Sequence, residues 1–214
     1  MSPGAKADIC LETPASTHEL GRTIGQACLG GERIALIGEM GAGKTAFARG
    51  LAEGLGIAPT AVSSPTFTIL HEHPDARDGL RLVHADAYRV ADLEELEALG
   101  WHELLEDGRT VIALEWPDRI QGALPAPSLV VRLEHGDGEQ RRFATVHVEE
   151  SGRHLHAVTP RTCPICEAPM DAGVETFPFC SSRCRMADLG KWFAGGYVVS
   201  REIEEDDLVD PDLG

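Results

Sequence analysis

The chain has 214 residues, of which 43% are hydrophobic and 25% charged, so neither wholesale disorder nor a fibrous repeat fits its composition. Its 35 acidic and 19 basic side chains give a net charge of −16, which disfavours broad electrostatic binding to a nucleic-acid backbone. The sequence has no run of about 18 apolar residues and no signal-like start. We therefore expect a cytoplasmic protein that does not enter a membrane and whose role toward RNA or DNA, if it has one, is indirect or local.

The first part of the chain alternates between short apolar runs and helical patterns. Strand-like runs occupy residues 33–37, 80–86 and 110–115, and helical patterns occupy residues 19–28, 45–55 and the segment after Asp92. The run at 110–115 is apolar on both faces, as in the middle of a parallel sheet that helices cover. This alternation predicts an α/β domain with a doubly wound, mostly parallel sheet.

Further along the chain the hydrophobic pattern changes to period two. Residues 129–133 and 143–148 alternate on either side of a glycine-rich turn, which predicts a hairpin that extends the sheet in antiparallel fashion. Residues 151–162 have neither period nor apolar bulk, and we interpret them as a linker. The predicted organisation is one domain over 1–150, this linker, a small module over 163–200 and an acidic, disordered tail over 201–214.

The segment GEMGAGKT, residues 38–45, fits the pattern G-x-x-x-x-G-K-[ST] and lies between a predicted strand and a predicted helix. Its glycines allow the backbone to curl so that successive N–H groups face phosphate oxygens, aided by the positive end of the following helix. Lys44 is expected to contact the β and γ phosphates and Thr45 to ligate Mg²⁺. The expected nucleotide-binding residues of this loop are Gly38, Glu39, Met40, Gly41, Ala42, Gly43, Lys44 and Thr45.

A nucleotide site of this kind also needs an acid for the metal and a group that orients the attacking water. Asp86 and Glu115 each end a predicted strand, and the carboxyl ends of parallel strands form the ligand site of an open sheet. We assign Glu115 to Mg²⁺, directly or through water. Asp86 is expected either to support the metal or to orient the water, and which acid binds the metal directly stays open. With Lys44, these acids are the predicted catalytic residues.

Five segments occur in an order that is typical of one family: the phosphate loop, SSPTFTI at 63–69, HADAYR at 84–89, LEELEALG at 93–100 and IALEWPDR at 112–119. Over roughly residues 10–150 the chain thereby resembles TsaE, the small P-loop ATPase of the bacterial machinery that installs threonylcarbamoyladenosine at position 37 of tRNA. The resemblance implies that the protein works with subunits of the threonylcarbamoyl transferase complex. It also implies an ATPase cycle that supports repeated turnover of that complex.

The same resemblance implies roles for individual residues. Thr66 would belong to a switch-like segment near the γ-phosphate, Trp116 would lie beside the nucleotide, and Thr17 would lie near it. Asp86 and Glu115 would serve Mg²⁺ and hydrolysis. Because the sequence shows no arginine that is obviously placed to act as a finger on the phosphates, we expect hydrolysis to be slow without partners.

A cluster of cysteines follows the predicted linker, with the spacing C-x-x-C, thirteen residues and then C-x-x-x-C: Cys163, Cys166, Cys180 and Cys184. Four thiolates in two knuckles predict a closed tetrahedral Zn²⁺ site that has no open catalytic position and is therefore structural. Met186, Leu189 and Phe193 recur at helical spacing, which predicts that the second knuckle opens a helix. Two disulfides and an iron–sulfur cluster are the alternatives to zinc.

The motifs CPIC, PFCSSRCR and DLGKWF make this segment similar to YacG, a small zinc protein described as an inhibitor of DNA gyrase. The resemblance implies binding to the surface of a protein such as gyrase rather than catalysis. Residues 201–214 contain seven carboxylates and one arginine, and they either dock on a basic surface or form a solvated terminus.

These observations predict a Mg²⁺-dependent ATPase of tRNA modification that carries a structural zinc module, with ATP, Mg²⁺ and Zn²⁺ as its ligands. Two alternatives stay open. A small-molecule phosphotransferase would use the same phosphate loop, although the sequence shows no arginine-bearing lid that would clamp an acceptor. A nucleotide-sensing interaction module would act through its zinc end instead of through hydrolysis.

Overall fold

The computed structural model describes residues 5–74, 76–136, 141–157, 161–162, 165–166, 169–170 and 181–193. Within these residues the strands are β1 (Ala5–Leu11), β2 (Arg33–Gly38), β3 (Leu70–His73), β4 (Arg81–Asp86), β5 (Thr110–Glu115), β6 (Leu129–His135), β7 (Arg142–Val148), β8 (Arg161–Thr162) and β9 (Pro169–Met170). The α-helices are α1 (Pro14–Ala27), α2 (Lys44–Gly54), α3 (Leu93–Glu97), α4 (Trp101–Glu106) and α5 (Ser182–Phe193). Short 3-10 helices are η1 (Pro59–Ala61), η2 (Arg77–Gly79), η3 (Pro117–Arg119) and η4 (Glu150–Ala157).

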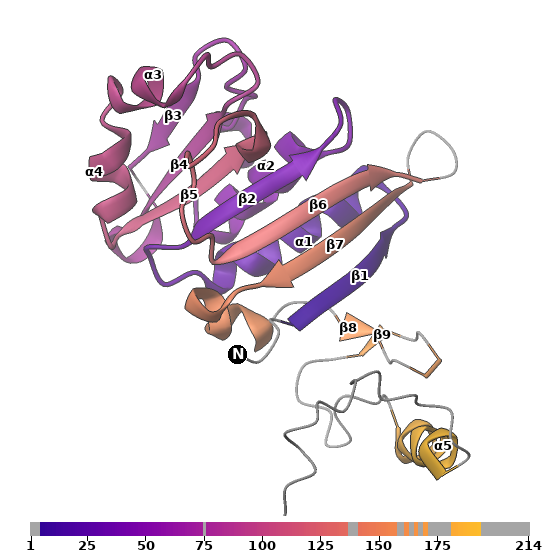
Figure 1. Ribbon diagram of the computed structural model, residues 1–214. Coiled ribbons are helices and arrows are strands. Elements are labelled where there is room, and N and C mark those ends of the chain that lie inside the picture. Colours follow the sequence, from indigo (N-terminus) through magenta and orange to yellow (C-terminus); the bar gives the residue numbers. More distant parts are fainter. Residues whose placement is uncertain are drawn as a thin grey trace, which may run out of the picture.

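One mixed sheet forms the centre of the main domain, with its strands in the order β1-β7-β6-β2-β5-β4-β3 (Figure 1). β2 pairs in parallel with β5 and β6, and β4 pairs in parallel with β5. The hairpin partner β7 runs antiparallel to β6 and to β1. The predicted α/β class, with parallel central strands and an antiparallel hairpin extension, is confirmed.

The sheet is more mixed than the sequence pattern indicated. β1 and β3 form its two edges, and both were missed because neither is an uninterrupted apolar run. The prediction gave the hairpin itself but not how it joins the central strands: its first strand, β6, is parallel to β2, and only β7 runs antiparallel to its neighbours. Residue alternation predicts a strand but carries no information on the direction of its neighbour.

Helices cover both faces of this sheet. Along β5, Val111 and Ala113 belong to the apolar cluster that packs on α1 and α2, whereas Ile112 and Leu114 belong to the cluster that includes α3 and α4. Successive side chains of a strand point to opposite faces, so the two clusters lie on opposite sides of the sheet. The prediction of a covered central strand at 110–115 is therefore confirmed.

Glycines bring α1 and α2 into backbone contact, and Figure 1 shows the two helices together behind β2, β6 and β7. A Cβ atom at Gly21 or Gly25 of α1 would overlap a backbone carbonyl of α2, and one at Gly50 or Gly54 of α2 would overlap a carbonyl of α1. Because neither helix can shift outward without losing this contact, α1 fixes the position of α2. The loop that precedes α2 is held in place with it.

The helix predicted after Asp92 is present as α3. The Asp92 Oδ1 atom accepts a hydrogen bond of 3.0 Å from the Glu95 backbone N–H, and Glu95 Oε2 accepts one of 2.9 Å from the N–H of Ala91. The helix is shorter than its pattern, because the chain turns at Gly100, which has a φ of 77°, and begins the separate helix α4. The capping interaction was predictable, but this break was not.

Residues 151–157, which we interpreted as part of a linker, are folded against the main domain. They lie in η4, where the Leu155 side chain is fully buried in the α1–α2 cluster. His154 Nε2 lies 2.9 Å from Glu32 Oε1, and the Glu32 carboxylate is itself buried and accepts the backbone N–H groups of Leu29 and Gly30. A single apolar residue in a polar segment gives no periodic signal, so the sequence pattern could not reveal this docking.

We expect Leu155→Ala to lower the free energy of unfolding of the main domain by about 2–5 kcal/mol, because it leaves a cavity in a closed core. Chemical denaturation followed by circular dichroism measures this change. Leu29→Ala is the matched control, since Leu29 is 71% exposed, and it should change the unfolding free energy by less than about 0.5 kcal/mol. Equal effects of the two substitutions would mean that η4 is not part of the domain core.

The remaining described residues belong to the C-terminal module. β8 pairs antiparallel with β9. The second cysteine knuckle opens a helix, as predicted, because α5 begins at Ser182 and Cys184 lies in its first turn. The Ser181 side chain accepts a hydrogen bond of 3.3 Å from the backbone N–H of Cys184 near the start of this helix. None of the helices in the described part of the chain has the length and apolar character needed to cross a lipid bilayer.

Candidate functional site

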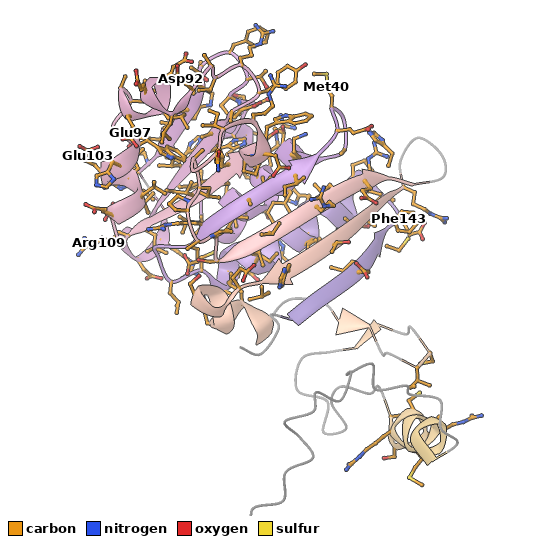
Figure 2. The ribbon with its side chains drawn as sticks, in the orientation of Figure 1. Met40, Asp92, Glu97, Glu103, Arg109 and Phe143 are labelled. Carbon is orange, nitrogen blue, oxygen red and sulfur yellow. The ribbon has the colours of Figure 1, made fainter. Side chains whose placement is uncertain are left out.

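The loop between β2 and α2 has the backbone shape of an anion-binding curl. Gly41 and Gly43 have φ values of 77° and 107°, in the left-handed region where a residue with a Cβ atom is strained. Gly43 is the N-cap of α2, and within the described residues no side chain caps it. The first N–H groups of α2 have no partner inside the helix, so they remain able to bind an anion. Figure 2 shows Met40 at the outer tip of this loop.

Lys44, the first residue of α2, turns back into the loop. Its Nζ atom donates hydrogen bonds to the carbonyl oxygens of Gly38 and Glu39, at 2.8 and 2.9 Å. The side chain is only 4% exposed, and Nζ lies 4.0 Å from the centre of the Trp116 ring. Burial lowers the pKa of Lys44, while the nearby carboxylates of Glu115 and Asp86 act in the opposite direction. A cation is therefore held at the point where the glycine loop closes.

Glu115 lies beside Thr45 at the carboxyl end of β5. Glu115 Oε1 accepts a hydrogen bond of 3.0 Å from the Thr45 hydroxyl and one of 2.9 Å from His84 Nε2 on the neighbouring strand β4. Both Glu115 and His84 are buried, so the two donors hold the carboxylate in one orientation. A hydroxyl and a carboxylate oxygen in contact are a suitable ligand pair for Mg²⁺, which prefers oxygen ligands. The residues present therefore fit this ion.

Asp86 is the register partner of Glu115 on β4, so the two acids lie side by side at the same end of the sheet. β4 does not flank β2 directly, because β5 lies between them. Asp86 Oδ2 accepts a hydrogen bond of 2.6 Å from the Thr66 hydroxyl, and Oδ1 accepts one of 2.8 Å from the Tyr88 N–H. Asp86 thus connects the segment around Thr66 to the sheet.

Trp116 covers the site from the turn that follows β5. Its φ and ψ angles of 60° and 44° are unusual for a bulky residue, and Pro117 follows it at once. The ring of Trp116 lies 5.2 Å from that of Tyr88, at an angle of 49°. The strained backbone therefore aims the indole across Lys44 rather than into solvent.

These side chains line one cavity of about 220 Å³. Its walls are formed by Met40, Gly41, Gly43, Lys44, Thr45, Ala46, Ser64, Thr66, Asp86, Tyr88, Glu115 and Trp116. The structure thus brings together most of the residues that we expected from the sequence, from four separate segments. Their individual roles in binding or catalysis stay predictions.

Four of the expected nucleotide-binding residues do not line this cavity: Thr17, Gly38, Glu39 and Ala42. Thr17 is buried on α1, behind the loop, where its Cγ2 atom would lie 3.4 Å from a Cβ atom at Gly43. Gly38 and Glu39 contribute carbonyl groups that Lys44 binds, and Ala42 is buried in the core. These residues support the loop from outside the cavity.

Sequence reasoning missed Ser64, Tyr88 and His84. Ser64 and Tyr88 each stand two residues from a predicted site residue, Thr66 and Asp86, and His84 stands two residues before Asp86 on the same strand. The Ser64 hydroxyl lies 2.8 Å from that of Thr66. His84 and Asp86 lie on the same strand, where side chains two apart share a face, and this spacing was the available signal for His84.

In the cysteine module, the Sγ atoms of Cys166 and Cys184 lie 3.6 Å apart. This separation is too long for a disulfide, in which it is about 2.05 Å. Zn–S bonds of about 2.3 Å in a tetrahedral site would place neighbouring sulfurs about 3.8 Å apart, so these two thiols fit a zinc ion. Cys163 and Cys180 lie outside the described residues.

The loop lies between a buried strand and a helix that begins with Lys44 and Thr45, and an acid from the neighbouring strand contacts the threonine. This arrangement defines a P-loop nucleotide-binding protein. The family model described as threonylcarbamoyl adenosine biosynthesis protein TsaE matches residues 11–143. The chain belongs to the TsaE family, as its motifs indicated.

Curated relatives support this assignment over the first two-thirds of the chain. The tRNA threonylcarbamoyladenosine biosynthesis protein TsaE of Streptomyces coelicolor is 43% identical over 123 residues, which cover 57% of this chain and 81% of the relative. The TsaE of Aquifex aeolicus is 38% identical over 136 residues, 63% of this chain and 92% of the relative. The crystal structure of YdiB from Bacillus subtilis superposes with a TM-score of 0.56 at 27% identity and covers 73% of this chain and 95% of that one.

The C-terminal part matches a second family. Residues 161–210 match the family model described as DNA gyrase inhibitor YacG. The resemblance predicted from the cysteine motifs is therefore confirmed. The chain joins a TsaE part to a part that is similar to YacG.

Proposed function

We propose that this protein binds and hydrolyses ATP with Mg²⁺, and that it does so as a partner of the threonylcarbamoyl transferase complex that modifies position 37 of tRNA. The observation that carries the proposal is the contact of the Thr45 hydroxyl with Glu115 Oε1, at 3.0 Å, beside the buried ammonium of Lys44. A hydroxyl, a carboxylate and a cation in this arrangement suit a metal-bound polyphosphate better than an uncharged ligand.

Within this proposal, Thr45 and Glu115 hold Mg²⁺, and the ion would neutralise charge on the β and γ phosphates. His84 keeps the Glu115 carboxylate turned toward Thr45. Asp86 accepts a hydrogen bond from the Thr66 hydroxyl. This contact places an acid and a hydroxyl together, where they could orient a water toward the γ-phosphate. Asp86 is therefore our candidate for the water-orienting group.

The size of the cavity supports a polyphosphate ligand. Sites that enclose a whole small molecule usually have volumes of about 300–1,000 Å³. The cavity here is about 220 Å³ and is lined by the loop, the two acids and the ring of Trp116. It suits the phosphate chain and the metal, and in this proposal the nucleoside lies against the rings of Tyr88 and Trp116.

We propose that hydrolysis is slow in the isolated protein. Arg89 and Arg119, the arginines nearest in sequence to the two acids, lie over aromatic rings, with guanidinium-to-centroid distances of 4.5 Å to Phe67 and 5.4 Å to Tyr88. These contacts hold both guanidinium groups over aromatic rings and not against the phosphate loop. A partner that supplied a cation or ordered the Thr66 segment would raise the rate.

For the C-terminal part we propose a structural Zn²⁺ held by Cys163, Cys166, Cys180 and Cys184, in a module that binds a protein such as DNA gyrase. Support comes from the 3.6 Å separation of the Cys166 and Cys184 sulfurs and from the family match. The burial of Leu155 leads us to extend the nucleotide-binding domain to residue 157, so that the connection between the two parts is shorter than 151–162.

Nucleoside analysis of tRNA tests the proposed pathway. In a bacterial strain that lacks its own TsaE, the full chain should restore threonylcarbamoyladenosine, and the Cys184→Ser variant should restore it as well. A Lys44→Met variant of the full chain should fail to do so while being present at the same level. Restoration by Lys44→Met, or normal tRNA with altered DNA supercoiling, would instead favour a protein that acts through its zinc end.

A further inference from the structure

Four successive carbonyl groups of the phosphate loop each accept a hydrogen bond. Lys44 binds the first two, those of Gly38 and Glu39. The next two are bound from the end of the β6–β7 hairpin, which lies beside the loop (Figure 1). His135 Nε2 lies 3.2 Å from the carbonyl oxygen of Met40, and Arg142 Nη2 donates to that of Gly41 at 3.1 Å.

His135 and Arg142 act on the loop as a pair, because they are register partners at the end of β6 and β7. The sheet therefore sets their spacing. Both side chains reach the loop from outside, and neither lines the cavity that holds the acids and Lys44. They contact the backbone of the loop rather than the place of a ligand.

The direction of a carbonyl group also sets the direction of the following N–H group. In a trans peptide the two point to opposite sides, so a carbonyl held outward turns the next N–H away from the donor that holds it. His135 thereby directs the N–H of Gly41, and Arg142 directs that of Ala42, which donates to the carbonyl of Glu39 at 3.2 Å. The curl depends on these orientations.

From this geometry we infer that His135 and Arg142 are positioning residues for the phosphate loop, a role that rests on the proposed nucleotide binding. A phosphate that binds Lys44 competes with the carbonyls of Gly38 and Glu39 for the three donors of its ammonium, so ligand binding weakens these two internal hydrogen bonds of the loop. The contacts from the hairpin do not compete with the ligand. They hold the tip of the loop in its binding shape while the ligand competes for Lys44.

The neighbouring Arg141 provides a matched control for Arg142. Arg141 Nε donates to Glu12 Oε2 at 2.9 Å, and its Nη2 atom lies 2.8 Å from the same oxygen. Replacement of either arginine by methionine removes one positive charge from the same end of the hairpin. Only Arg142→Met removes the donor to the Gly41 carbonyl.

Calorimetric titration of the full chain with ADP and Mg²⁺ tests the inference. Arg142→Met should raise the Kd about tenfold, whereas Arg142→Lys, which keeps a donor and a charge, should stay within about threefold of the original chain. Arg141→Met should leave the Kd unchanged. His135→Leu should weaken binding severalfold, and His135→Gln, whose amide can donate to Met40, should recover most of it.

The results separate this inference from the proposed function. If the unsubstituted chain takes up no ADP with Mg²⁺, both the proposed function and the positioning role are wrong. If it binds ADP but Arg142→Met binds equally well, only the positioning role is wrong. Equal weakening by Arg141→Met and Arg142→Met would assign the effect to charge and overturn the role of the Gly41 contact. Thermal unfolding of each variant without nucleotide shows whether the fold is retained. If Arg142→Met has lost its fold, the comparison of His135→Leu with His135→Gln tests the inference in its place.

Discussion

Replacement of Lys44 by methionine is expected to lower ATP binding and hydrolysis by about a hundredfold or more. The Lys44 ammonium is the cation that the fold places at the closure of the glycine loop, 2.8 Å from the Gly38 carbonyl and almost fully buried. Methionine keeps the bulk of the side chain, so the loop should keep its packing while it loses the charge. Release of inorganic phosphate at saturating ATP and Mg²⁺, together with the Kd for ADP, measures the loss.

The matched control for this substitution is Arg22→Met. Arg22 lies on α1 and pairs with Glu19 at 2.5 Å on the surface of the helix, so its loss removes the same charge away from the site. The control variant should hydrolyse ATP at the original rate. A Lys44→Met variant that did so too would show that phosphate release does not arise from the site described above.

Removal of the metal from the cysteine module is the second change with a large expected effect. Cys184→Ser should abolish the binding of about one zinc ion per chain, because a small module of this kind folds around its metal. Elemental analysis measures the zinc, and amide hydrogen exchange over α5 (Ser182–Phe193) measures the loss of protection that should accompany it. Binding of ADP should be unaffected, since the proposed nucleotide site lies in the TsaE part of the chain.

Cys10→Ser serves as the control for this experiment. Cys10 lies on β1, is exposed, and contacts Glu12 at 3.3 Å rather than the other cysteines. The control chain should keep its full zinc content and the protection of α5. Zinc at the original stoichiometry in Cys184→Ser would contradict the assignment of Cys184 as a ligand.

Much of the candidate site could be predicted because its signals are local. The spacing of residues 38–45, between an apolar run and a helical pattern, predicts a phosphate loop without any knowledge of distant residues. Asp86 and Glu115 could be predicted from their places at strand ends, since parallel strands finish at one edge of a sheet. The structure places both acids there in register.

Other features depend on which strands become neighbours. The contact between His84 and Glu115 joins residues 31 positions apart, and that between Met40 and His135 joins residues 95 positions apart. No periodic pattern within either segment indicates such a pair. The position of Thr17 behind Gly43 also depends on distant segments, because it follows from the packing of α1 against α2 at their glycines.

The sequence by itself determined the glycine curl, its lysine and threonine, the acids at two strand ends and the two cysteine knuckles, since each of these is encoded within a few residues. Only the tertiary structure decided that β6 runs parallel to β2, that Leu155 closes the core and that the β6–β7 hairpin binds the phosphate loop. Those outcomes depend on packing and backbone hydrogen bonding between segments far apart in the chain, which a local pattern cannot specify.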